Sequence, residues 1–234
     1  MTKNEILESL KGSVVISCQA LPNEPLYVEE KSIMYLMARA AKQAGTPAIR
    51  TNSVRDVKAI KEETNLPVIG LIKRDYEGSE VYITPTMKEI DELVLASSDV
   101  IALDCTFSKR LNNMSINDFL KQIKEKYPDV ILMADISTYE EAINAYNCGV
   151  DIIGTTMNGY TTQSIDENIS NIDLVKKLVS EVSIPVIGEG RIHYPHQARE
   201  MLDAGAYAVV VGGAITRPLE IAQRFIDAAK GDIV

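Results

Sequence analysis

The strongest constraint on the fold of this chain is a series of short, apolar, β-rich runs that recurs along its whole length. There are eight such runs, at residues 13–17, 47–50, 67–72, 99–103, 130–134, 151–155, 185–188 and 207–211. Most are continuously apolar rather than alternating in polarity, which is typical of parallel strands with both faces covered. The pattern predicts an α/β fold built on a buried parallel sheet.

Helical patterns lie between these runs, at 33–43, 54–63, 87–96, 139–147, 172–182 and 195–204. Capping boxes are predicted where Thr86 precedes Glu89 and where Thr138 precedes Glu141, and Pro195 suits a first helical position. Three glycines that follow helical patterns are expected to act as left-handed C-terminal caps: Gly45, Gly149 and Gly205.

Two of the apolar runs are nearly identical. LPVIG at 66–70 recurs as IPVIG at 184–188, about half the chain length later. In a closed ring of eight strands, half the chain is four strands, so strands three and seven face each other. We predict a single (β/α)8 TIM barrel over residues 1–234, with 1–11 as a short N-terminal helical extension that covers one end. A doubly wound open sheet is the alternative, because PVIG suits any buried parallel strand.

The charge balance restricts the partners. The chain has 24 Lys and Arg against 33 Asp and Glu, a net charge of −9 that repels nucleic acid and anionic membrane surfaces. No apolar stretch approaches the roughly 20 residues that span a bilayer, and residues 1–11 lack the apolar centre of a signal peptide. We therefore expect a cytoplasmic protein that acts on a small molecule, with no nucleic-acid or membrane partner.

Neither the cysteines nor the histidines indicate a metal site. Cys18, Cys105 and Cys148 are widely spaced and form no CxxC, so neither a disulfide framework nor a zinc site is supported, and a reducing compartment is expected. His193 and His196 lie together, without carboxylate–histidine sets at other strand ends. We expect no built-in metal.

If the barrel forms, its active site lies at the carboxyl ends of the strands. The residues at these ends are Gln19, Arg50, Lys73, Asp104, Asp135, Thr155, Thr156, Glu189, Gly212 and Gly213. Asp104 and Asp135 could instead cap the turns that follow their strands. Lys73 and Glu189 follow opposite strands and are expected to meet over the mouth of the barrel.

The last two strand ends indicate a phosphate site, because the loops after strands seven and eight of such barrels commonly bind phosphate through main-chain N–H groups. Gly190, Arg191, Gly212 and Gly213 supply the unobstructed backbone. Arg217, just before Pro218, could add a positive charge or be an ordinary surface residue.

Taken together, these motifs resemble those of the N-acetylmannosamine-6-phosphate 2-epimerase family, phosphosugar epimerases with a (β/α)8 barrel. The matching segments are SCQALPNEPL (17–26), AIRTN (48–52), PVIGLIKRDY (67–76), VYITPTMKEIDEL (81–93), IALDCT (101–106), MADIST (133–138), GTTMNGYT (154–161), IGEGRI (187–192) and VVGGAITRP (210–218). They follow one another in order over nearly the whole chain. The segment FSKRLNN after Thr106 departs from the expected Arg-Pro pair, which leaves the role of Arg110 open.

The resemblance implies an isomerase that interconverts N-acetylmannosamine 6-phosphate and N-acetylglucosamine 6-phosphate in sialic acid and amino sugar breakdown, without a cofactor. Inversion at C2 requires an opened ring, because the C2 hydrogen is acidic only beside a carbonyl, and it requires a base and a means of stabilising the enolate. The resemblance implies that Lys73 and Glu189 handle the C2 proton and ring opening. Which is base and which is acid stays open, because the two titrations are coupled.

The resemblance also implies that Gln19, Arg50, Asp135 and Tyr160 bind the sugar. Two other classes remain: a thiamine-phosphate-synthase-like transferase, which would require Mg2+ for its diphosphate, and a non-catalytic phosphosugar-binding barrel. The final helix carries a set of apolar residues: Leu219, Ile221, Ala222, Phe225 and Ile226. We expect them to pack on a second subunit in a homodimer, although packing on their own barrel is equally natural.

Overall fold

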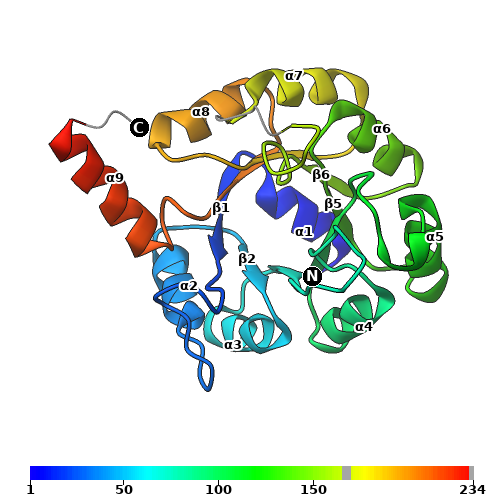
Figure 1. The fold of residues 1–234 in the computed structure, drawn as a ribbon, viewed down its shortest axis with the longest axis horizontal. Coiled ribbons are helices and arrows are strands. Elements are labelled where there is room, and N and C mark those ends of the chain that lie inside the picture. Colours follow the sequence, from blue (N-terminus) through cyan, green and yellow to red (C-terminus); the bar gives the residue numbers. More distant parts are fainter. Residues whose placement is uncertain (165–169, 232–234) are drawn as a thin grey trace.

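The structure, a computed structural model, describes residues 1–164 and 170–231. Its eight strands pair in parallel in chain order, and the barrel closes where the first strand pairs with the last (Figure 1). The strands are β1 (Ser13–Cys18), β2 (Ile49–Asn52), β3 (Val68–Leu71), β4 (Val100–Asp104), β5 (Leu132–Asp135), β6 (Ile152–Gly154), β7 (Val186–Glu189) and β8 (Ala208–Val211). The predicted (β/α)8 barrel is confirmed, and the open-sheet alternative is wrong.

The helices are α1 (Lys3–Leu10), α2 (Met34–Gln43), α3 (Val54–Thr64), α4 (Met87–Leu95), α5 (Ile116–Lys126), α6 (Tyr139–Asn147), α7 (Ile172–Glu181), α8 (Pro195–Asp203) and α9 (Pro218–Lys230), with a 3-10 turn at Leu111–Asn113. Both capping boxes and the Pro195 start are confirmed. The three predicted cap glycines have φ angles of 97°, 79° and 99°, so they do supply left-handed backbone after their helices.

Helix α5 is absent from the predicted segments. Its signal is nevertheless present in the sequence: the Ser115 side chain accepts a hydrogen bond from the backbone N–H of Asp118, as an N-cap does. Its buried residues recur at helical spacing: Ile116, Phe119, Leu120 and Ile123.

The second strand begins two residues later than the predicted run 47–50. Pro47 has no N–H to donate to the ladder, and the backbone N–H of Ile49 donates to the carbonyl of Pro67 at 3.0 Å. Arg50 therefore lies within β2 and not at its end, and its side chain occupies an inward-facing position.

Inward-facing side chains follow a period of two along each strand. Met133 on β5 and Ile187 on β7 belong to the apolar cluster inside the barrel, so the next inward positions on these strands are Asp135 and Glu189. On the other strands, the inward position after the last apolar interior residue is occupied by Ser17, Arg50, Lys73, Asp104 and Gly212. Polar and charged groups thus begin where the apolar layers of the barrel end.

Helix α1 closes the opposite end of the barrel. Its residues Ile6 and Leu10 are buried in the same apolar cluster as the interior residues of the strands. Figure 1 shows α1 drawn inside the ring of strands and not among the outer helices. The chemistry of the carboxyl end is therefore built over a continuous apolar floor.

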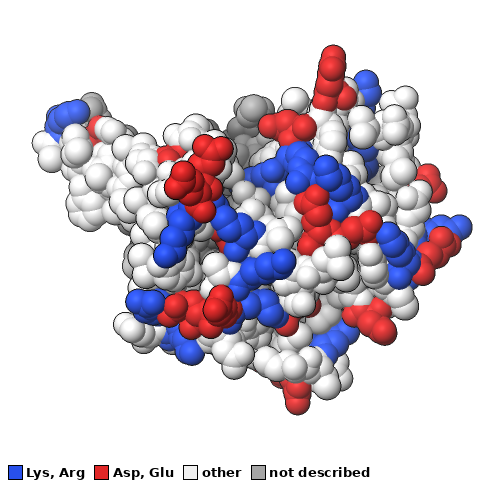
Figure 2. All heavy atoms as spheres, turned by 90° about the horizontal axis from the view of Figure 1, so that it is seen from below, with Lys and Arg blue, Asp and Glu red and all other residues white. Residues whose placement is uncertain are grey.

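Helix α9 is positioned differently from the other outer helices. Figure 1 shows it projecting away from the barrel, and none of its thirteen described residues is buried. Figure 2 shows the projecting helix with a largely uncharged surface, whereas positive and negative side chains are mixed over the body of the protein. Phe225 on this helix is 76% exposed.

Helix α1 makes a testable contribution to stability. Leu10 is fully buried, so Leu10→Ala leaves a cavity beneath the strands and is expected to lower the free energy of unfolding by about 2–5 kcal/mol. Leu95 is 79% exposed, and Leu95→Ala is the matched control, with an expected change below about 0.5 kcal/mol. Urea denaturation measures both values, and equal values would show that α1 does not support the barrel floor.

Candidate active site

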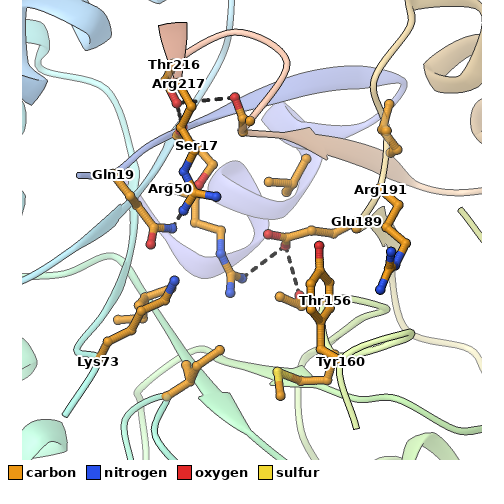
Figure 3. A pocket seen from close by; sticks show the side chains of 18 of the residues that line it. Ser17, Gln19, Arg50, Lys73, Thr156, Tyr160, Glu189, Arg191, Thr216 and Arg217 are labelled. Carbon is orange, nitrogen blue, oxygen red and sulfur yellow. Dashed lines mark hydrogen bonds and ion pairs between the residues drawn. The ribbon is translucent and has the colours of Figure 1, made fainter. Parts of the chain in front are cut away.

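A cavity of about 270 Å³ opens at the carboxyl end of the barrel. Its lining comes from β1, β2, β3, β7 and β8, from the loops after β1, β3, β6, β7 and β8, and from the first turn of α9. Figure 3 shows ten labelled side chains around it: Ser17, Gln19, Arg50, Lys73, Thr156, Tyr160, Glu189, Arg191, Thr216 and Arg217. Residues distant in sequence therefore share one small polar space, as expected for an active site of this fold.

The centre of the site is the buried guanidinium of Arg50, which is 1% exposed. Its Nη1 and Nη2 atoms contact Oδ1 and Oδ2 of Asp135 at 3.1 and 2.6 Å, and Nη1 lies 3.3 Å from Oε2 of Glu189. A charge buried this deeply is stable only when it is paired and hydrogen-bonded. The two-pronged contact with Asp135 also fixes the orientation of the guanidinium.

Thr156 links the two carboxylates. Its hydroxyl lies 2.7 Å from Oδ1 of Asp135 and 2.9 Å from Oε2 of Glu189. A hydroxyl carries one proton, so it can hydrogen-bond both carboxyl groups fully only when one of them is protonated and donates to it. The geometry thus accommodates a proton shared between Thr156 and Glu189.

Glu189 and Lys73 have pKa values displaced toward neutrality from opposite sides. Burial raises the pKa of Glu189 to about 7, with Asp135 adding to the effect and Arg50, Thr156 and Lys73 opposing it. Burial also lowers the pKa of Lys73 to about 8, assisted by Arg217 and Arg50 and opposed by Glu189. Both groups can therefore exchange protons near pH 7.

Lys73 and Glu189 lie on opposite sides of the cavity, and the Arg50 side chain lies between them (Figure 3). Among the described residues, no ion pair within 4.0 Å joins the two. The structure thus brings them to one cavity, on either side of Arg50.

Local contacts fix both groups. The backbone N–H of Lys73 donates to Oδ1 of Asn52 at 2.8 Å, and its Nζ lies 6.0 Å from the ring centre of Tyr82. Thr155 clamps the end of β7, because its hydroxyl contacts both the carbonyl and the N–H of Glu189, at 2.8 and 2.9 Å. Tyr82 was not predicted, because it lies in the loop after β3 and not at a strand end.

Two aspartates at strand ends, Asp104 and Asp135, are not among the described residues that line the cavity. Asp135 is fully buried and its contacts are to Arg50 and Thr156. Asp104 accepts hydrogen bonds from the backbone N–H and the hydroxyl of Thr106, so it caps the turn after its strand. Burial raises the pKa of Asp104 to about 6. Arg110 donates to the Asp104 carbonyl at 2.9 Å, so it supports this turn outside the cavity.

Glycines line the other end of the cavity. Gly190, Gly212 and Gly213 all contribute to its wall. Gly190 has a φ of 102°, a backbone conformation that strongly favours glycine. No side chain of these three residues covers the backbone at this end, although the Glu220 carboxylate lies against Gly213.

The two arginines predicted at this end already have protein partners. Arg191 donates to the carbonyl of Gly159 at 2.6 Å and stacks over the ring of Tyr160, 4.8 Å from its centre. Arg217 pairs with Glu24 and Glu220, each at 3.0 Å. Neither glutamate was predicted: Glu24 approaches from the loop after β1, whereas Glu220 lies in the first turn of α9, three residues after Arg217.

Gln19 has a vacant acceptor in the cavity wall. Its Nε2 donates to the hydroxyl of Ser17 at 2.9 Å, whereas its buried Oε1 has no partner among the described atoms.

Tyr160 is 56% exposed at the rim. His193 also lines the cavity from the loop after β7, and His196 lies in the first turn of α8. No group of three or more His, Cys, Asp or Glu with metal-binding geometry occurs in residues 1–164 and 170–231.

A closed (β/α)8 barrel whose cavity holds two groups with pKa values near neutrality is typical of TIM-barrel enzymes that use acid–base chemistry. The sequence profile of a family described as “Putative N-acetylmannosamine-6-phosphate epimerase” matches residues 34–231. The chain belongs to this family.

Curated relatives described as “Putative N-acetylmannosamine-6-phosphate 2-epimerase” support the assignment. The protein of Caldanaerobacter subterraneus is 48% identical over 97% of this chain and 94% of its own length. That of Clostridium perfringens is 50% identical over 96% of this chain and its whole length. No helix in the described part of the chain is long and apolar enough to cross a membrane.

Two solved structures show the difference between likeness to the family and likeness in fold alone. The N-acetylmannosamine-6-phosphate 2-epimerase from Clostridium perfringens superimposes with a TM-score of 0.90 at 49% identity, covering 95% of this chain and 96% of that one. A thiamine phosphate pyrophosphorylase from Pyrococcus furiosus reaches 0.60 at 20% identity over 96% and 98% of the chains. The latter likeness concerns the barrel fold alone.

The raised pKa of Glu189 predicts a pH-dependent stability. Because the pKa is about 7 in the folded protein against 4.5 for the free group, folding takes up a proton between these values. The contribution of this group is complete below pH 4.5 and is lost as the pH rises through 7. We expect the free energy of unfolding of Glu189→Gln, relative to wild type, to increase by up to about 3 kcal/mol across this window. A difference that stays constant in urea titrations from pH 4.5 to 7 would contradict the raised pKa.

Proposed function

We propose that this protein interconverts N-acetylmannosamine 6-phosphate and N-acetylglucosamine 6-phosphate, and that it acts in sialic acid and amino sugar breakdown. Family membership supports the substrate, and one observation supports the chemistry: Lys73 and Glu189 face one cavity with pKa values near 8 and 7. Proton transfer at carbon beside a carbonyl needs a base and an acid with pKa values near the working pH.

The reaction begins with opening of the sugar ring, which creates a carbonyl at C1. A base then removes the proton from C2, and the electron pair moves into an enolate. A proton returned to the opposite face of C2 gives the epimer, so no net electrons or protons are consumed. We assign the C2 proton and ring opening jointly to Lys73 and Glu189, because they line one cavity from opposite sides.

Arg50 is the group that we assign to the developing enolate, because its cationic guanidinium lines the cavity. Asp135 acts through Arg50: it is fully buried and holds the guanidinium by two contacts. The vacant Oε1 of Gln19 suits a donor such as the acetamido N–H. Tyr160 closes the rim of the sugar site.

The phosphate is assigned to the glycine-lined end. Gly190, Gly212 and Gly213 allow the phosphate to approach the backbone closely, and Arg191 and Arg217 provide positive charge at the same end. With the phosphate held there, the open chain extends toward Lys73 and Glu189.

An isotope-exchange experiment tests the assignment of the catalytic pair. In D2O, NMR of the C2 position should show deuterium entering either sugar phosphate with the wild-type protein. Lys73→Ala and Glu189→Ala should each slow this exchange at least about 100-fold, because each removes a positioned acid or base. Lys121→Ala is the matched lysine control on an exposed surface.

The same experiment separates the competing functions. An unchanged exchange rate in both variants would refute the catalytic assignment. Binding of the sugar phosphate without any exchange in wild type would indicate a non-catalytic phosphosugar-binding barrel. A strict requirement for Mg2+ and a diphosphate substrate would favour the thiamine-phosphate-synthase-like transferase.

We also propose that the protein is a cytoplasmic homodimer in which α9 contacts a second copy. Three unpaired cysteines support a reducing compartment. Leu219, Phe225 and Ile226 on α9 are 58%, 76% and 49% exposed, and an apolar helix face of this kind gains stability when a partner covers it.

The dimer proposal predicts the effect of a charge on α9. Phe225→Lys places an ammonium in the apolar face and should convert a dimeric protein to a monomer in sedimentation velocity, because the charge would be buried without a partner. Phe107→Lys, at a residue 57% exposed in the loop after β4, is the matched control and should remain dimeric. A wild-type protein that sediments as a monomer would rule out the dimer.

A further inference from the structure

The glycine-lined end of the cavity contains a carboxylate that the proposed reaction does not use. Glu220, the third residue of α9, lines the same cavity as Gly212 and Gly213. A Cβ atom at Gly213 would clash with Oε2 of Glu220, so this oxygen lies directly against the glycine backbone. An anion of the protein itself therefore occupies the surface to which we assign the phosphate.

The same carboxylate pairs with Arg217, a cation that lines this cavity. Nη1 of Arg217 lies 3.0 Å from Oε1 of Glu220, and its Nε lies 3.0 Å from Oε1 of Glu24. One guanidinium is thus shared by two carboxylates. A phosphate that approaches Arg217 meets two carboxylates around this guanidinium, and they repel it unless one of them leaves.

Glu220 is the carboxylate that is free to leave. The backbone N–H of Leu21 donates to Oε2 of Glu24 at 3.0 Å, which ties this side chain, 19% exposed, to its own loop. The side chain of Glu220 is 41% exposed. It starts from a helix that projects from the barrel, so rotation about its own side-chain bonds would carry the carboxylate into solvent.

We propose that Glu220 is a specificity-determining residue that acts as an internal competing anion. It fills the glycine-lined end when no substrate is bound, and the phosphate of the substrate displaces it and takes over Arg217. A phosphate dianion gains more from the guanidinium and the backbone N–H groups than a carboxylate does, whereas a singly charged ligand gains little from the exchange. The site therefore favours doubly charged ligands over carboxylates and other monoanions.

This inference rests on the proposed phosphosugar function, and it carries a quantitative consequence. The apparent affinity for phosphate is the intrinsic affinity reduced by the fraction of molecules whose glycine-lined end is vacant. Removal of the charge of Glu220 increases that fraction. Phosphate then binds more tightly, although a polar contact has been removed from the protein.

The test is calorimetric titration of the full-length protein with inorganic phosphate. Glu220→Gln is expected to lower the Kd for phosphate by roughly three- to tenfold, at the low end of usual coupling factors because the carboxylate is partly solvent-screened. Glu220→Ala should act in the same direction and also removes the bulk of the side chain. In steady-state assays, KM for the sugar phosphate should fall by a similar factor, without a matching rise in kcat.

Asp227→Asn is the matched control, because it removes one negative charge from the same helix at a residue outside the cavity. It should leave the Kd for phosphate unchanged, whereas a general effect of net charge would tighten binding in this variant too. A Kd that is unchanged or weaker in both Glu220 variants would overturn the inference, because Glu220 would then only support Arg217.

The outcomes also distinguish this inference from the proposed function. If wild type binds phosphate and epimerises the sugar but the Glu220 variants bind phosphate no better, only the inference fails. If wild type neither binds phosphate nor exchanges the C2 proton, the phosphosugar function fails and the inference fails with it.

Discussion

The buried guanidinium of Arg50 is the interaction on which the carboxyl end of the barrel depends. Asp135 holds it by two contacts, and Glu189 lies 3.3 Å from it on the other side. The positive charge of Arg50 favours a lower pKa at both neighbouring groups: it adds to the effect of burial on Lys73 and opposes the effect of burial on Glu189. Since a buried charge requires partners, the position of Arg50 fixes where the carboxylates must lie.

The barrel separates stability from chemistry along its axis. Inward positions in the lower layers are apolar, and α1 seals that end with Ile6 and Leu10. Polar groups begin one inward step above Met133 and Ile187, where the packed layers end. The desolvation that displaces the pKa values of the site therefore comes from the same close packing that stabilises the barrel.

The sequence was sufficient for the fold and for much of the site. Eight continuous apolar runs admit few arrangements, and the two-residue offset between the predicted run 47–50 and β2 still leaves Arg50 in the strand. It was not sufficient to separate Asp135 from Glu189. Both end strands in similar settings, but only Glu189 lines the cavity, since the Arg50 and Thr156 side chains cover Asp135.

By itself, the sequence determined the eight-stranded barrel and the residues that follow its strands, including the glycines at 190, 212 and 213, because these follow from local periodicity and strand order. Only the tertiary structure decided which charges face one another. Arg217 pairs with Glu24 from the other end of the chain, and α9 projects from the barrel with none of its described residues buried. Such contacts depend on how separate loops converge in space, and Coulomb energies change steeply over a few ångströms that no sequence spacing encodes.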